Sequence, residues 1–374
     1  MNNKYYKSLQ LLRCFAFLAI FFFHSTVLPE AFSRWSITVF LMLSGFLNAL
    51  HGYEKRLPND VKSSLKYAIR KIKGIYPLHL IMLLVAVILH VFSTRAEILS
   101  DFKNNIITEG LKLITNIFLI SDWGPKSGWW YRIFSEYNIV TWYLSLSLIL
   151  FLLTPLFIKI MHKLYDGCDN NFLVRPIMAV LIIYVVTIII NVTFVFRFGG
   201  QGAFLYIYEH PLSRAGDYLI ALQIGYMYVR SEKRIADDNR AKGKIRVYGI
   251  LVIATLVVLA SQIYLSIAMI PPEKSWVVSS GFFFTMPTAV LVYSLGAIED
   301  SFTKKIESNV ILERVTNVLI YIGSISQYAY LIHVPVINLI HGVYSRIAEV
   351  NLAIWSVIAF IVTMGMSYIV KAKK

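Results

Sequence analysis

Apolar residues gather along the chain in long runs that are separated by short polar stretches. Runs of about 17 to 25 apolar residues match the length of helix that crosses a bilayer. Ten such runs cover residues 9–28, 35–51, 75–93, 139–160, 177–196, 213–229, 247–269, 277–298, 316–342 and 352–371. This pattern predicts an all-α fold, a polytopic bundle of about ten transmembrane helices.

The composition supports a membrane protein and argues against an ordinary soluble domain. Of the 374 residues, 57% are hydrophobic and only 15% are charged. The net charge of +15 would also suit a protein that binds nucleic acid. However, no basic groove or aromatic ladder motif accompanies it. We therefore expect the lipid bilayer as a partner and no nucleic acid.

The basic residues lie mainly in the connections that one side of the membrane would share. Connections 52–74 and 230–246 each carry seven Lys or Arg residues, and both fall on the same side if the ten spans are counted correctly. Lys4, Lys7 and the C-terminal lysines fall on that side too. The positive-inside rule then places both termini in the cytoplasm. We expect a single domain over residues 1–374, without an appended soluble domain, in the cytoplasmic membrane.

The least regular part of the sequence is the outward connection 94–138. Its stretch Ile106 to Ile120 is moderately apolar, which predicts an amphipathic or re-entrant helix rather than an extra span. An aromatic group follows it beside Gly and Pro. This group suits either an interfacial aromatic belt or a surface for a sugar ring or lipid-linked acceptor; its members are Trp123, Trp129, Trp130 and Tyr131.

Arg13 and His24 share one apolar stretch, Leu9 to Leu28. Eleven residues of α-helix make about three turns, so both side chains project from one face about 16 Å apart. An Arg at the centre of a transmembrane helix costs roughly 2.5 kcal/mol or more and usually faces a bundle interior or a cavity. The pair therefore indicates a pathway or an active site. Alternatively, Arg13 snorkels to the inner headgroups and His24 is a hydrogen-bonded packing residue.

Three further parts of the sequence could contact a ligand. Ser44 and Gly45 are small residues in the middle of the second span, where a ligand or merely another helix can approach closely. The next connection ends in the basic run RKIKGIYP at 70–77, which would attract an anionic cofactor from the cytosol. His333 precedes Pro335, which can loosen the helix, so His333 suits acceptor binding or a hydrogen-bonded packing role.

Charged residues elsewhere have simpler interpretations. Arg214 and Asp217 are three residues apart at the start of the sixth span and would pair structurally on one helix face. Asp122 and Glu136 in the outward connection are expected to be solvated loop charges. The histidines form no HExxH spacing, so we expect no metal site.

Five segments together resemble the acyltransferase type 3 family of integral membrane acyltransferases. They occur in the family's order and spacing over nearly the whole chain, on a layout of ten spans. The segments are Arg13 with His24, FLMLSGFL at 40–47, RKIKGIYP at 70–77, TWYLSLSLILFLLTP at 141–155 and ISQYAYLIHVPV at 325–336.

The resemblance implies transfer of an acyl group, commonly acetyl from cytosolic acetyl-CoA, to a hydroxyl of a sugar or surface-polymer precursor. Some members of this chiefly bacterial family act on antibiotics or other small molecules instead. Residue by residue, it makes His24 the catalytic histidine and Arg13 its partner. Arg70 and Lys73 match basic positions implicated in donor handling or in local structure. We assign substrate contacts to Ser44, Gly45, Trp142 and His333.

The sequence departs from the family pattern at Ser147 and at Lys73. Many members have a glutamate in the fourth span where this chain has Ser147, which weakens any role for a carboxylate there. Lys73 stands where an arginine is often found.

The chemistry can be argued from the residues alone. Acyl transfer from a thioester to an alcohol needs a base for the hydroxyl proton, and a neutral imidazole suits that task near pH 7. His24 is placed to act as this base, or to carry the acyl group transiently. We therefore predict an O-acyltransferase that uses acetyl-CoA, or another acyl-CoA, and a glycan or lipid-linked saccharide acceptor.

Two other classes of protein remain open. A transporter or flippase would explain ten spans and buried cations without a base at His24. A receptor or scaffold would tolerate substitution of both Arg13 and His24. The acceptor's identity and the oligomeric state do not follow from the sequence.

Overall fold

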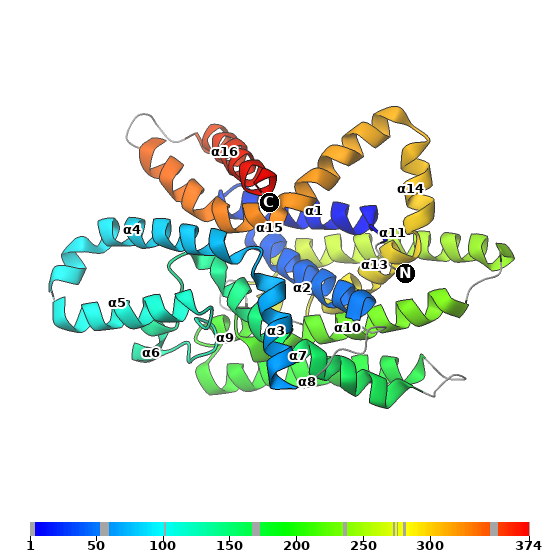
Figure 1. The fold of residues 1–374 in the computed structure, drawn as a ribbon, viewed down its shortest axis with the longest axis horizontal. Helices are drawn as coiled ribbons and strands as arrows, with labels where there is room; N and C mark the ends of the chain where they lie inside the picture. Colours follow the sequence, from blue (N-terminus) through cyan, green and yellow to red (C-terminus); the bar gives the residue numbers. More distant parts are fainter. Residues whose placement is uncertain are drawn as a thin grey trace.

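Helices make up the regular structure throughout the described part of the chain, which contains no strand (Figure 1). The computed structural model describes residues 4–52, 60–100, 102–166, 173–234, 238–271, 274, 276–279, 282–344 and 351–373. The predicted all-α polytopic bundle is therefore confirmed.

The longer helices follow the apolar runs, and short helices connect them. Their bounds are α1 Lys7–His24, α2 Glu30–Gly52, α3 Val61–Ile72, α4 Tyr76–Ser100, α5 Phe102–Ile117, α6 Gly128–Ile133, α7 Trp142–Tyr165, α8 Val174–Phe198, α9 Phe204–Tyr208, α10 Pro211–Arg234, α11 Asp238–Ala268, α12 Trp276–Ser279, α13 Thr285–Ala297, α14 Glu299–Glu307, α15 Val310–Tyr344 and α16 Leu352–Ala372. A 3-10 turn, Ile139–Thr141, leads into α7.

Seven helices in the described residues are long and apolar enough to cross a membrane. The helix pair α3 and α4, bent by 66° at its break, would make an eighth. The other two predicted spans, 213–229 and 277–298, fall on α10 and on the short α13. α10 carries several charged side chains, and α13 has only 13 residues. The count of ten spans and the cytoplasmic termini stay predictions.

The start of α1 is fixed by a carboxylate from α14. The backbone N–H groups of Lys7 and Ser8 donate to the Glu299 side chain at 2.7 and 3.0 Å. These N–H groups have no partner within the helix, and a negative charge at this end is favourable. The cap therefore sets where the helix that carries Arg13 and His24 begins.

The centre of the bundle depends on close helix contacts. α1 packs against α2 and α15, and α2 packs against α10. Gly45 of α2 faces α10, where an added Cβ would lie 2.7 Å from the Cβ of Ala221 and would collide with the Tyr218 carbonyl oxygen. Gly45 thus serves helix packing, the second of its two expected roles.

A buried ion pair holds α10 to its neighbours. Arg214 and Asp217 are in contact at 3.3 Å, as their spacing predicts. Asp217 also accepts hydrogen bonds from Thr38 of α2 and Thr285 of α13. Because both charges are almost fully buried, this network ties three helices together.

The connection 94–138 contains a helix where the sequence predicts one. α5 covers most of the stretch Ile106 to Ile120 and packs beside α4 (Figure 1). Trp129 and Trp130 are half-exposed, which suits either of their two expected roles. The indole N–H of Trp123 donates instead to the Ser145 carbonyl of α7 at 3.1 Å. It therefore anchors the connection to the bundle.

Candidate functional site

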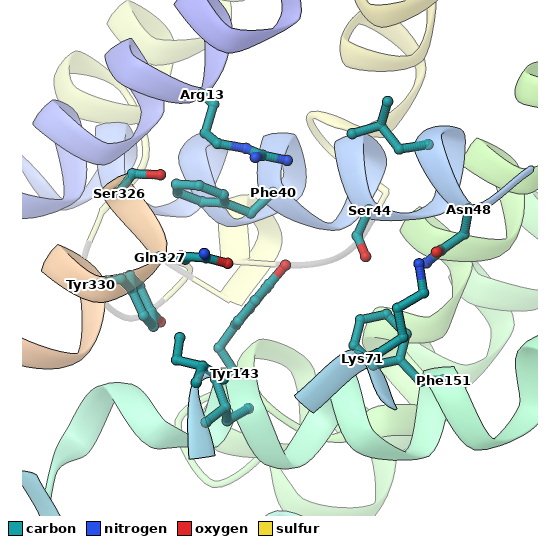
Figure 2. Close-up of a pocket in the computed structure, with 13 residues that line it drawn as sticks. Arg13, Phe40, Ser44, Asn48, Lys71, Tyr143, Phe151, Ser326, Gln327 and Tyr330 are labelled. Atoms are coloured by element: carbon teal, nitrogen blue, oxygen red, sulfur yellow. The ribbon is translucent and has the colours of Figure 1, made fainter. Parts of the chain in front are cut away.

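Arg13 projects into a cavity of about 300 Å³ enclosed by four segments of the bundle and the α3–α4 bend. Figure 2 shows the side chains of Arg13, Tyr143 and Gln327 directed toward the same space. We call it the Arg13 cavity. Its polar lining comes from Arg13, Ser44, Asn48, Lys71, Tyr143, Ser326, Gln327 and Tyr330.

His24 lines a second cavity, of about 270 Å³, which we call the His24 cavity. Two carboxylates, Glu30 and Glu209, share its lining. Aromatic rings make up much of the remainder; they belong to Phe23, Trp142, Phe204, Tyr208 and Tyr330.

The cavities follow one another along α1. Tyr330 belongs to the lining of both the Arg13 cavity and the His24 cavity. A third cavity, of about 240 Å³, includes Lys4 and His51 and shares Arg13 and Leu47 with the Arg13 cavity. Arg13 and His24 thus face a common row of cavities, as their spacing predicts. The row runs from the start of α1 to its end.

The Arg13 cavity and the His24 cavity differ in the charged side chains that line them. In the described residues, the Arg13 cavity is lined by two cations, Arg13 and Lys71, and by no carboxylate. The His24 cavity has two carboxylates, Glu30 and Glu209, and no Lys or Arg among its described lining residues. The first environment therefore favours an anionic ligand, whereas the second suits hydroxyl groups that donate hydrogen bonds.

His24 lies beside His333 of α15, with ring centroids 5.1 Å apart. The Nδ1 of His333 is 2.8 Å from the Tyr330 carbonyl oxygen. A carbonyl oxygen only accepts, so Nδ1 carries the proton and Nε2 keeps a lone pair. Nε2 is buried without a hydrogen-bonding partner. His333 is absent from the His24 cavity's described lining, which favours a packing or positioning role over acceptor binding.

Pro335 explains why α15 is tied to the start of α7 at this level. Proline has no N–H, so the Leu331 carbonyl loses its usual helical partner. The side-chain amide of Asn138 donates to that carbonyl at 3.0 Å. This bond fixes the segment of α15 that carries Tyr330 and His333 against the outward connection.

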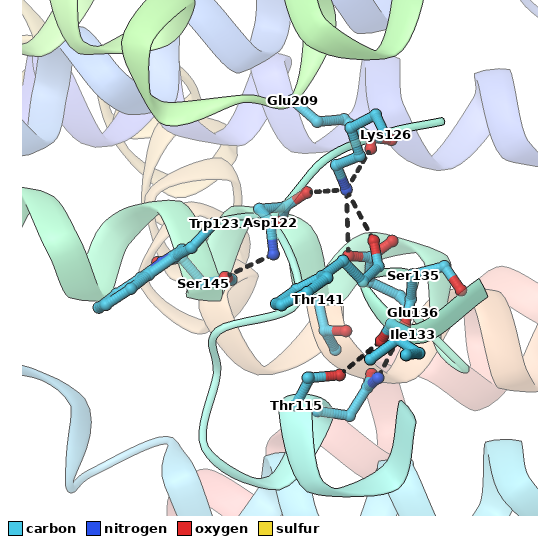
Figure 3. Close-up of polar contacts among 12 residues, drawn as sticks. Thr115, Asp122, Trp123, Lys126, Ile133, Ser135, Glu136, Thr141, Ser145 and Glu209 are labelled. Atoms are coloured by element: carbon cyan, nitrogen blue, oxygen red, sulfur yellow. Dashed lines mark hydrogen bonds and ion pairs between the residues drawn. The ribbon is translucent and has the colours of Figure 1, made fainter. Parts of the chain in front are cut away.

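A buried ion cluster lies behind the His24 cavity. The Nζ of Lys126 is 2.5 Å from Asp122, 3.3 Å from Glu209 and 3.8 Å from Glu136 (Figure 3). Asp122 and Glu136 are buried, so their expected role as solvated loop charges is wrong. Lys126 and the distant Glu209 provide the partners that make this burial possible.

The three carboxyl groups of the cluster repel one another because they share a single ammonium group. Burial and the neighbouring Glu136 raise the pKa of Glu209 to about 7. Burial and Glu136 also raise the pKa of Asp122, and the effect of Lys126 only partly offsets them. In contrast, burial and the adjacent Lys126 lower the pKa of His210 to about 4. Glu209 is thus poised to change protonation near neutral pH.

A sequence model of the family described as "Acyltransferase domain" matches residues 6–372, nearly the whole chain. The chain belongs to this acyltransferase family. The comparison with curated proteins and the comparison with solved structures gave no significant match. With its apolar helices, the protein is a membrane acyltransferase, as the resemblance implied.

The acyltransferase brings together most of the residues that its sequence singled out. Arg13 and Ser44 line one cavity, and His24 and Trp142 line the next, with His333 behind His24. Gly45 is directed toward α10 instead.

In the basic run before Pro77, the residue that lines the Arg13 cavity is not one of the two that the sequence analysis named. Arg70 and Lys73 are exposed, with the Arg70 guanidinium 5.7 Å from the centre of the Tyr67 ring. Neither lines the Arg13 cavity, whereas Lys71 does. All three side chains are exposed, and Lys71 lies where α3, packed against α7, borders the cavity. The amino-acid sequence alone does not indicate which of these three cations lines the cavity.

Besides Lys71, sequence reasoning missed three residues of the acyltransferase site. Tyr330 and Tyr143 lie within recognised segments, next to His333 and Trp142, but aromatic residues are common in membrane helices. Glu209 stands in a short connection with no neighbour in sequence that marks it. Only its contact with Lys126, 83 residues earlier, reveals its place.

Proposed function

We propose that this acyltransferase moves an acetyl or other short acyl group from cytosolic acyl-CoA to a hydroxyl of an exported glycan or lipid-linked saccharide. The proposal rests on one observation. A cationic cavity containing Arg13 and a carboxylate-lined cavity containing His24 meet at Tyr330.

The donor would occupy the cationic side. Coenzyme A carries several phosphate charges, and Arg and Lys are the residues that bind such groups. Arg13 and Lys71 line the Arg13 cavity, and Lys4 lies in the adjoining cavity toward the start of α1. The exposed Arg70 and Lys73 would attract the donor to the mouth. The long pantetheine arm would then carry the thioester past Arg13 toward His24.

The acceptor would occupy the His24 cavity. Aromatic rings such as Trp142 and Tyr208 provide apolar faces for a sugar ring, and the Glu30 and Glu209 carboxylates accept hydrogen bonds from hydroxyl groups. A hydroxyl-rich, uncharged acceptor fits this lining better than an anionic one. These features support a saccharide as acceptor.

His24 would act as the general base of the reaction. A ring nitrogen of His24 takes the proton of the acceptor hydroxyl while the hydroxyl oxygen attacks the thioester carbonyl carbon. A C–O bond forms, the C–S bond breaks, and the leaving thiolate recovers a proton from the imidazolium. The products are the acyl ester and free coenzyme A. His333 would act as a positioning residue that holds the side of His24 away from the cavity.

Sealed inside-out membrane vesicles provide the test, with labelled acetyl-CoA outside and lipid-linked saccharides in the membrane. We expect label to enter the saccharide fraction with the wild type and to be lost with His24→Ala. His162→Ala is a matched control because His162 pairs with Asp166 at the other end of α7. Equal labelling by His24→Ala at normal expression would overturn the proposal. Label that enters only when the donor is inside the vesicles would overturn the cytosolic origin of the donor.

A further inference from the structure

Tyr330 of α15 forms the boundary between the two main cavities. It lines both the Arg13 cavity and the His24 cavity, and no other described residue belongs to both linings. Its side chain is almost fully buried, with 8% of the residue exposed. A path from Arg13 to His24 therefore passes this side chain.

Aromatic neighbours hold the Tyr330 ring in place. The ring centroids of Tyr143 and Phe40 lie 5.6 and 6.2 Å from it, within the range of favourable aromatic pairs. Figure 2 shows Tyr330 at the edge of the Arg13 cavity, beside Tyr143 and Gln327. Each pair contributes about 1 kcal/mol beyond the burial of the ring itself, so a ligand that covers the same apolar surface could displace the ring.

The backbone of Tyr330, in contrast, is fixed. Its carbonyl oxygen accepts a hydrogen bond from His333, and the next carbonyl, that of Leu331, accepts one from Asn138. The ring, which also packs against the His333 ring at 5.7 Å between centroids, can therefore change its position by side-chain rotation while the backbone of this segment stays in place.

A barrier at this point has a chemical purpose. If the two cavities were always joined, water from the acceptor cavity would reach the thioester of each arriving donor. Water would then replace the acceptor hydroxyl: a C–O bond to water forms, the C–S bond breaks, and a free carboxylic acid and coenzyme A result. Excluding water from a reactive group is a common role of mobile active-site elements.

We propose that Tyr330 is a gate between the donor and acceptor cavities, which the acyl arm of the thioester displaces. While the ring is in place, water in the acceptor cavity does not reach a thioester held on the donor side. This inference rests on the proposed function for the direction of each substrate, but the barrier itself can be tested without any acyl transfer.

Cysteine labelling tests the barrier directly. In a background with Cys14→Ser and Cys168→Ser, Ser33→Cys places a thiol in the His24 cavity and Ser44→Cys places one in the Arg13 cavity. A small charged methanethiosulfonate reagent is added to the cytoplasmic face of sealed inside-out vesicles. We expect it to label Ser44→Cys in every variant. It should label Ser33→Cys only when Tyr330→Ala is present.

Two control variants separate the gate from a general loosening of the bundle. Tyr330→Phe keeps the ring and should leave Ser33→Cys protected. Phe151→Ala enlarges the Arg13 cavity without touching the His24 cavity, and it should also leave Ser33→Cys protected. If Tyr330→Ala fails to fold, as loss of Ser44→Cys labelling or aggregation would show, Tyr330→Leu replaces it. Equal labelling of Ser33→Cys with and without the Tyr330 ring would overturn the proposal.

Hydrolysis of labelled acetyl-CoA without acceptor, compared with acyl transfer when the acceptor is supplied, provides the second readout. We expect Tyr330→Ala to raise the ratio of hydrolysis to acyl transfer several-fold over the wild type, and Tyr330→Phe to leave the ratio near the wild-type value. An unchanged ratio in Tyr330→Ala would contradict the role of the gate in coupling. If vesicles show no acyl transfer but Ser33→Cys labelling follows the ring, the proposed function fails and the barrier stands.

Discussion

The imidazole rings of His24 and His333 come from opposite ends of the chain and lie with centroids 5.1 Å apart and planes inclined by 59°. The first ring faces the carboxylate-lined cavity, and the second is buried behind it among Phe17 and Phe21 of α1. His333 is fixed by its bond to the Tyr330 carbonyl. In this arrangement His24 can reach the substrate, and His333 can hold the His24 ring in place.

His333→Phe tests the positioning role because it keeps a ring in the same space and removes both nitrogens. We expect kcat for acyl transfer to fall by about tenfold, since misplacing a reacting group by a small distance is costly, while the donor KM stays unchanged. Steady-state kinetics with varied acyl-CoA would show the split. A rise in KM without a change in kcat would instead assign His333 to substrate binding.

The three cations before Pro77 are expected to have different effects on the donor. Lys71 lines the Arg13 cavity, so Lys71→Gln should raise the donor KM at both low and high salt. Arg70 and Lys73 lie outside the cavity lining, so Arg70→Gln and Lys73→Gln should slow donor association mainly at low salt, where long-range attraction is least screened. Stopped-flow binding at two ionic strengths measures this difference. A larger effect of Lys73→Gln than of Lys71→Gln at high salt would contradict the assignment.

Gly45→Ala should destabilise the bundle because its new Cβ would overlap the backbone of α10 at Tyr218. Overpacking of this kind typically costs about 1 to 3 kcal/mol. Gly365→Ala on α16 is the matched control, since nothing lies within 4 Å of its added Cβ. Thermal unfolding in detergent should show a lower Tm for Gly45→Ala and no loss for Gly365→Ala. Equal Tm values for both variants would show that α2 and α10 are not in close contact.

The helices of this acyltransferase could be predicted from its sequence because a bilayer demands long apolar runs, and those runs are visible one residue at a time. The spacing of Arg13 and His24 also predicts their common row of cavities, since an α-helix has a fixed repeat. The pairing of Arg214 with Asp217 is equally local. Each of these features depends on residues close together in the chain.

The remaining features depend on contacts between distant segments. Asp122 and Glu136 look like loop charges until Lys126 and Glu209 are brought beside them. That Lys71, rather than Arg70 or Lys73, lines the Arg13 cavity depends on how α3 packs against α7. Likewise, Tyr330 is one aromatic residue among many until two cavities are seen on either side of it.

Glu209 should make the stability of the protein depend on pH. Burial and Glu136 raise the pKa of Glu209 from 4.5 to about 7. Between these values the folded chain keeps a proton that the unfolded chain has lost, so the free energy of unfolding falls as pH rises through this window. The loss is at most about 1.4 kcal/mol per pH unit for one proton.

Glu209→Gln removes this titration, and the fall in Tm between pH 5 and pH 7.5 should be smaller than in the wild type. Comparing the two proteins at each pH cancels the contribution of His210, which has the opposite sign because burial lowers its pKa to about 4. The same pH dependence in both proteins would show that Glu209 is ionised, or solvated, throughout the range.

The central claim is that Arg13 serves donor binding and His24 serves the chemical step. Its most direct measurement is kcat for acyl transfer, together with donor affinity, in Arg13→Gln and His24→Ala. We expect Arg13→Gln to weaken donor affinity by about 10- to 100-fold, because a charged hydrogen-bonding partner is lost. His24→Ala should lower kcat by about 100-fold or more with donor affinity unchanged. Wild-type kcat in His24→Ala, in protein that is folded and binds donor, would contradict the account.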